Sequence, residues 1–378
     1  MRSFAFSPPK RPELPKNRIV PTIPTVPNFF KPERSSTVVL FRRVHVLSYG
    51  YKHPHRFARN PMASSSSSSS GFSNGAANSW VVAQRVRHAS HAGSWYSDGA
   101  KELDRQLGEW LERVGPPQGA ARAIISPHAG YSYCGETAAY AFKQVDPDRV
   151  KRIFVLGPSH IVFLNGCALT TCAKYRTPLR DLVVDVQVNS ELVATDAFEP
   201  MSLRNEEAEH SLEMQMPFVA KLMGDRHFTI VPVLVGSLSV KRQQAYGKIF
   251  AHYLADPQNL FVISSDFCHW GSRFHYQPHS ATSAKPIHEQ IALLDQRAME
   301  AIAAMDPPIF NEYLKETQNT ICGRNPICVM LQAAEYFRQM NNHTADLRFL
   351  KYSQSNKCRS VHESSVSYAA GALFVQPK

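Results

Sequence analysis

The sequence of 378 residues lacks a long hydrophobic run, a regular cysteine pattern and an internal repeat. No apolar run reaches the roughly 18 residues that a membrane-spanning helix needs, so we expect no membrane span. The seven cysteines include no CxxC pair, which argues against a disulfide framework and predicts free thiols in a reducing compartment. Without a repeat of about 20–50 residues, solenoid and propeller folds are excluded.

Surplus positive charge is absent from most of the chain, although the formal net charge is +11. Residues 1–61 hold 12 Lys and Arg residues against two acids, for a net charge of +10. The remaining residues hold 30 bases against 29 acids, for a net charge of +1. Because phosphate neutralisation requires clustered Lys and Arg, we expect no nucleic-acid binding by the body of the protein.

The N-terminal segment also lacks the apolar core of a secretory signal. It is basic and proline-rich, and residues 62–79 after it are rich in Ser, Gly and Asn, which predicts disorder. Either residues 1–61 are an organelle transit peptide, or Met62 is the true start; we favour the second interpretation because MASSSS resembles an ordinary disordered N-terminus. We therefore expect a disordered leader, 1–80, and a folded domain, 81–378. The expected compartment is the cytoplasm or nucleus, unless the leader directs import into an organelle.

Short β-rich runs alternate with helical patterns in the body of the sequence. The patterns predict strands at 122–127, 151–160, 227–236, 259–267 and 365–375, and helices at 135–145, 211–223, 240–254, 285–305, 307–317 and 326–340. CALTTC, YRTPL and LVVD indicate short strands of a peripheral hairpin. Several strands are apolar throughout, as in a sheet covered on both faces. We predict a single α/β domain with a central mixed, largely parallel sheet flanked by helices.

Three of the expected strands end in polar residues. The first ends in SPHAGY with His128, the second in GPSH with His160, and FVISS leads into Asp266, Cys268 and His269. In open α/β sheets, ligands bind beyond the carboxyl ends of the strands. One such histidine is commonly a hydrogen-bonding residue, but the repetition favours a metal or catalytic role for His128 and His160, since imidazole binds borderline metals.

Other chemically distinctive residues have two interpretations each. Cys322 precedes an expected helix, whose N-terminus and Arg324 would stabilise a thiolate, but a small buried apolar role fits equally well. Glu209 and His210 bracket a helix start, and of a functional role and a capping role we favour capping. Trp95 belongs either to the core or to a site.

Several short motifs, in order along the chain, resemble those of the Memo family. They are HASHAGSWY, ISPHAGYSYCG, IFVLGPSH, EHSLEMQ, PVLVG, FVISSDFCHWG, NTICGRNPI and SSVSYAAGAL. The likeness runs from about His88 to Val375, and the leader is not part of it. The family is similar in fold to the class III extradiol dioxygenases, which are non-haem iron enzymes with an α/β core.

The resemblance implies a metal-binding cleft and assigns roles within it. The metal ligands would be His128 of SPHAGY, His160 of GPSH and Cys322 of ICGR. Asp266 and His269 of SSDFCHW would be acid–base or supporting groups. The mouth of the cleft would be lined by Trp95, Tyr133, Arg273 and Arg324.

The family resemblance also implies alternative functions. Members have been described as redox proteins that bind iron or copper, and as binders of phosphotyrosine-containing peptides in receptor-driven cell motility. We therefore expect a redox protein with one iron or copper ion; the alternative is a peptide-binding signalling module without catalysis. Extradiol dioxygenases use two histidines and a carboxylate, so a thiolate at Cys322 argues against ring cleavage and favours Cu(I) or redox-cycling iron. The oligomeric state is left open.

Overall fold

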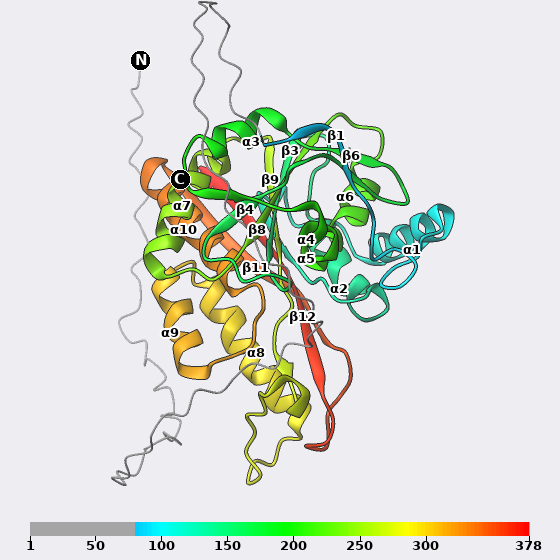
Figure 1. Ribbon diagram of the computed structural model, residues 1–378. Helices are drawn as coiled ribbons and strands as arrows, with labels where there is room; N and C mark the ends of the chain where they lie inside the picture. Colours follow the sequence, from blue (N-terminus) through cyan, green and yellow to red (C-terminus); the bar gives the residue numbers. More distant parts are fainter. Residues whose placement is uncertain (1–79, 378) are drawn as a thin grey trace, which may run out of the picture. The chain divides into compact units, whose positions relative to one another are not determined.

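The strands that were expected to carry the site lie side by side in one sheet of the computed structural model, which describes residues 80–377. β2 (Ala123–Ser126), β9 (Asn259–Ser264), β3 (Arg152–Pro158) and β8 (Thr229–Val235) are consecutive neighbours, and each of the three pairs is parallel. β4 (Cys167–Leu169) and β7 (Phe198–Pro200) extend the sheet beyond β8 (Figure 1). The predicted mixed, largely parallel sheet is confirmed.

The other edge of the sheet is antiparallel. β12 (Ser365–Pro377) pairs with β2, with β10 (His269–Trp270) and with the long strand β11 (His343–Gln354). A second, three-stranded sheet consists of β1 (Val82–Arg87), β5 (Cys172–Arg176) and β6 (Asp181–Val183). The predicted hairpin is therefore correct for β5 and β6, but CALTTC was wrongly placed in it, because β4 pairs with β8 of the main sheet instead.

Helices cover both faces of the main sheet. One face carries α7 (Val240–Ala255), α8 (Ile287–Ala303), α9 (Pro307–Thr317) and α10 (Arg324–Met340); the other carries α1 (Ala100–Arg113), α2 (Tyr131–Phe142) and α6 (Met216–Met223) (Figure 1). Each face has its own hydrophobic cluster. Phe154 and Leu156 of β3 enter one cluster, whereas Ile153 and Val155 enter the other. This double burial explains why the strand is apolar throughout.

The helix after β2 begins four residues earlier than predicted, at Tyr131 rather than Gly135. Gly135 therefore lies inside α2, where a glycine would ordinarily weaken the helix. A Cβ atom at this position would lie 2.3 Å from a ring carbon of Trp110 on α1. Close packing of the two helices thus requires the glycine that the sequence pattern marked as a boundary.

The expected helix at 211–223 is two helices, so its predicted continuity was wrong. α4 (Leu203–Ala208) precedes α5 (His210–Glu213), and α6 starts after Gln215, whose side chain is buried and donates hydrogen bonds to Ser126 and Pro127. α3 (Val186–Val193) and the short 3₁₀ helix η1 (Ser272–Phe274) complete the elements. The predicted leader lies outside the described residues, apart from Trp80. Within residues 80–377, no helix combines the length and apolarity needed to cross a membrane.

Candidate functional site

The carboxyl ends of β2, β3 and β9 bring the predicted histidines and aspartate together. His128, His160 and Asp266 each follow the last residue of their strand by two positions. Because the three strands are parallel neighbours, these side chains emerge at one edge of the sheet. The predicted convergence of the strand ends is confirmed.

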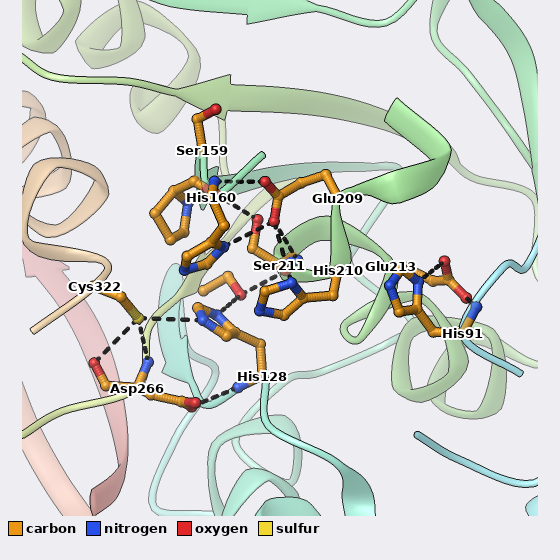
Figure 2. Close-up of polar contacts among 12 residues, drawn as sticks. His91, His128, Ser159, His160, Glu209, His210, Ser211, Glu213, Asp266 and Cys322 are labelled. Carbon is orange, nitrogen blue, oxygen red and sulfur yellow. Dashed lines mark hydrogen bonds and ion pairs between the residues drawn. The ribbon is translucent and has the colours of Figure 1, made fainter. Parts of the chain in front are cut away.

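The centre of this cluster consists of His128, His160 and Cys322. One imidazole nitrogen from each histidine and the Cys322 Sγ all lie within 4.8 Å of one another. Cys322 Sγ is 3.2 Å from His128 Nε2, and the two histidine rings are 5.2 Å apart at 76°. Figure 2 shows the three side chains pointing toward one another. Two imidazoles and a thiol are the types of donor that borderline or soft metal ions prefer, so this group could hold such an ion.

His160 is held by the carboxylate of Glu209, which is 1% exposed. Glu209 accepts hydrogen bonds from the His160 backbone N–H at 2.7 Å and from His160 Nδ1 at 2.9 Å. Burial alone would lower the pKa of His160, but hydrogen bonds to Cys322 and Glu209 outweigh it and raise the pKa to about 10. Burial would raise the pKa of Glu209, yet the contacts with His160 lower it to about 2. Glu209 also caps α5 through Ser211 N, so the predicted capping role is correct but incomplete.

His128 is held from two sides. Its backbone N–H donates to Asp266 Oδ1 at 2.8 Å, and its Nδ1 lies 2.7 Å from Ser264 Oγ. Burial, reinforced by the nearby histidines His160, His210 and His269, lowers the pKa of His128 well below its usual value. Burial and the neighbouring histidines thus both favour the neutral form of the His128 ring.

Asp266 and His269 line the same cavity as His128 and His160, and both form hydrogen bonds with backbone groups. Burial raises the pKa of Asp266 to about 7, although backbone N–H groups of His128 and Ala129 oppose the shift. The His269 backbone N–H donates to Thr320 Oγ1 at 2.8 Å, and its Nδ1 lies 2.9 Å from the carbonyl of Phe267. Burial lowers the pKa of His269.

A cavity of about 700 Å³ opens over the cluster. Three of the four residues predicted for its mouth line it, namely Trp95, Tyr133 and Arg273. The fourth, Arg324, is not among the described residues that line the cavity; it is exposed and donates to the carbonyl of Ile321. Ser132, Phe274 and residues of the β11–β12 connection complete a wall that is partly aromatic and partly hydroxylated.

His210 is a cavity residue that the capping interpretation missed. Its ring stacks on His160 at 4.4 Å and lies 4.6 Å from Trp95. Burial and the neighbouring His160 lower the pKa of His210 to about 4. The motif EHSLEMQ places it directly after Glu209, but the sequence contained no signal that would separate a cap from a cavity residue.

His160, Glu209 and His210 also form a group with metal-binding spacing. Its carboxylate is already engaged, because Glu209 accepts from His160 Nδ1, from the His160 backbone and from Ser211 N at 3.0 Å. The His128–His160–Cys322 group is therefore the better candidate.

Comparisons with known proteins identify a single family. A family model described as "Memo-like protein" matches residues 87–372. The chain is 65% identical over 294 residues to "Protein memo-1 homolog" of Caenorhabditis elegans, which covers 78% of this chain and 84% of that protein. It is 52% identical over 291 residues to "Protein MEMO1" of Homo sapiens, and the match covers 76% of this chain and 97% of that protein. A crystal structure of an uncharacterised Escherichia coli protein matches with a TM-score of 0.41 and 15% identity, covering 65% of this chain and 98% of that chain.

Proposed function

Because the chain belongs to the Memo-like protein family, we propose that it binds one redox-active metal ion, iron or copper, through His128, His160 and Cys322. The observation that carries this proposal is the convergence of two imidazole nitrogens and one thiol within 4.8 Å. The chemistry of the set suits the ion, since imidazole binds iron and copper and a thiolate favours soft or redox-active metals. The biological role would be in redox and metal homeostasis, coupled to signalling.

A bound iron or copper ion would supply one-electron exchange with an oxidant such as O₂ or superoxide. The protein's own residues would hold protons and limit the access of water. His269 and Asp266 line the same cavity and would hold protons beside the reacting molecule. Trp95 and Tyr133 would limit access of water to it, because their rings lie on the cavity wall.

The test is metal reconstitution of the purified protein under anaerobic conditions, followed by elemental analysis. We expect about one ion per chain. A His128→Ala/Cys322→Ser variant should lose this ion. The matched control is His288→Ala/Cys358→Ser, which changes a histidine and a cysteine that are not among the described residues lining the cavity; His288 Nδ1 lies 3.2 Å from the Cys358 backbone carbonyl. Equal metal content in wild type and in the His128/Cys322 variant would refute the proposal.

A second candidate function is a phosphotyrosine-peptide-binding module without catalysis. It is favoured by one observation: the cavity wall combines the aromatic rings of Trp95 and Tyr133 with the guanidinium of Arg273. A guanidinium pairs strongly with phosphate. Peptide binding that is lost in Arg273→Ala but unaffected by a chelator would support this module over the metal protein. An extradiol dioxygenase is less favoured, because the third candidate ligand is a thiol rather than a carboxylate.

A further inference from the structure

The segment from Glu209 to Gln215 lies beside both candidate histidine ligands. Glu209 bonds His160, whereas the Ser211 carbonyl and the Gln215 side chain both bond Ser264, which in turn bonds His128. One short stretch of chain therefore holds the His160 ring directly and the His128 ring through Ser264, and Figure 2 shows Glu209 on the side of the His160 ring away from Cys322.

The proton position on His160 follows from its partner. A carboxylate can only accept hydrogen bonds, and Glu209 Oε1 lies 2.9 Å from His160 Nδ1. Nδ1 must therefore carry a hydrogen. Any proton that leaves His160 when a metal binds comes from Nε2, the nitrogen on the Cys322 side.

The proton position on His128 follows from the Ser264 hydroxyl, which has a single hydrogen to donate. Ser264 Oγ donates to the carbonyl of Ser211 at 2.7 Å, which uses its single hydrogen. Its lone pairs then accept from Gln215 Nε2 at 2.9 Å and from His128 Nδ1 at 2.7 Å. Nδ1 of His128 is consequently the donor, and the lone pair of its Nε2 faces the Cys322 Sγ at 3.2 Å.

We infer that Glu209 and Ser264 are positioning residues of the proposed metal centre, which hold the rings of His160 and His128 with the hydrogen on Nδ1 and so direct both Nε2 atoms toward Cys322. The expected effect on metal binding rests on the proposed function, whereas the proton positions on the two histidines do not depend on it. Partners of this kind fix the tautomer and orientation of a ligand histidine, and their loss typically weakens metal binding by about 10–100-fold.

The structure offers a matched control in Glu213 and His91. Glu213 accepts from the His91 backbone N–H at 2.9 Å and from His91 Nδ1 at 2.7 Å, the same pair of contacts that Glu209 makes with His160. The His91 ring, however, lies edge-on to Trp95 at 5.4 Å. Figure 2 shows this pair apart from the His128–Cys322 group.

The experiment compares Glu209→Gln, Ser264→Ala and Glu213→Gln with the wild type, using full-length protein whose folding is verified by thermal unfolding. Iron(II) and copper(I) affinities are measured by competition with a chromophoric chelator. We expect Glu209→Gln and Ser264→Ala to weaken binding by about 10–100-fold and Glu213→Gln to change it by less than about threefold. Equal losses in all three variants would indicate a general structural effect and overturn the inference.

The proton positions are read separately by ¹⁵N NMR of histidine side chains in the metal-free protein. His128 should show the neutral Nδ1–H form, and Ser264→Ala should alter its signals while those of His91 stay unchanged. A His128 signal of the Nε2–H form in the wild type would overturn the inference. If the wild type binds no metal, the proposed function fails, whereas the spectra still decide the tautomers.

Discussion

Two carboxylate–histidine pairs of the same local geometry have different surroundings. In both Glu209–His160 and Glu213–His91, one carboxylate accepts from the backbone N–H and from Nδ1 of its histidine. The His160 ring faces the Cys322 thiol, whereas the His91 ring does not belong to the candidate ligand group. Two histidines that are held alike by a carboxylate therefore differ in whether their other ring nitrogen belongs to a group of candidate metal ligands.

The carboxylates also differ in what neutralises them. Glu213 forms an ion pair with the buried Arg87 at 2.5 Å and accepts from Tyr96 OH at 2.7 Å. Arg87 further donates to the backbone carbonyls of Glu206 and Glu209. The Glu213 pair is thus part of a structural network that fastens the end of β1 to α4 and α5.

The largest expected effect comes from removing the cation of that network. Arg87→Met would leave the Glu213 carboxylate buried with only His91 and Tyr96 as side-chain partners, and removing one member of a buried ion pair costs about 3–5 kcal/mol. Chemical denaturation should show this loss in the free energy of unfolding. The control Arg105→Met, on the exposed face of α1, should leave stability nearly unchanged. A small effect of Arg87→Met would contradict the structural role.

Tyr96→Phe should have a smaller effect. It removes one hydrogen bond to the Glu213 carboxylate, and such bonds to charged groups contribute about 1.5–3 kcal/mol. Metal affinity should stay close to that of the wild type, since the buried Tyr96 side chain bonds Glu213 rather than Glu209. A loss of metal binding at unchanged stability would show that the two pairs are coupled.

Acid should weaken the Glu213 pair gradually. Burial raises the pKa of Glu213, but His91 and Arg87 outweigh it and lower the pKa below its usual value of 4.5. A carboxyl with a lowered folded-state pKa contributes stability that is fully present above the unfolded value and lost as the pH falls. Denaturation curves should therefore show a steeper loss of stability below about pH 4.5 in the wild type than in Glu213→Gln. Parallel pH profiles would argue against this contribution.

The smallest effect is expected for a third carboxylate–histidine pair, in which a single carboxylate oxygen accepts both contacts. His88 N–H and Nδ1 both contact Glu207, at 3.0 and 2.8 Å, but the His88 side chain is 64% exposed. Exposed pairs contribute about 0–1 kcal/mol because water and salt screen them. His88→Ala should therefore unfold at nearly the same denaturant concentration as the wild type. A loss of unfolding free energy as large as that in Tyr96→Phe would show that the hydrogen-bond geometry of the pair matters more for stability than its burial.

Much of the fold could be predicted from local patterns. The cores of β2, β3, β8 and β9 lie within the predicted ranges, because fully buried strands need uninterrupted apolar runs. β1 and β11 were missed, since at least half of the residues in each strand are polar and most are partly or fully exposed. The break between α5 and α6 was missed too, because helical periodicity does not show that Gln215 must turn inward to bond Ser126 and Pro127.

The candidate site could be predicted in part. His128, His160 and Asp266 stand at strand ends, which the sequence shows directly. Arg324 was expected at the cavity mouth from the family resemblance, but at the start of α10 it donates to the Ile321 carbonyl instead. The partnership of Glu209 with His160 spans 49 positions, and no local pattern connects them.

The α/β class and the types of residue at the strand ends follow from the amino-acid sequence, because periodicity, turns and side-chain chemistry are local properties. The tertiary structure alone decided that β2, β9 and β3 are neighbours and that Cys322 meets His128. It also decided which of three similar glutamates supports the candidate ligand His160. Contacts between distant residues depend on strand order and helix packing. The same local patterns fit more than one strand order, and the packing of the folded core selects one of them.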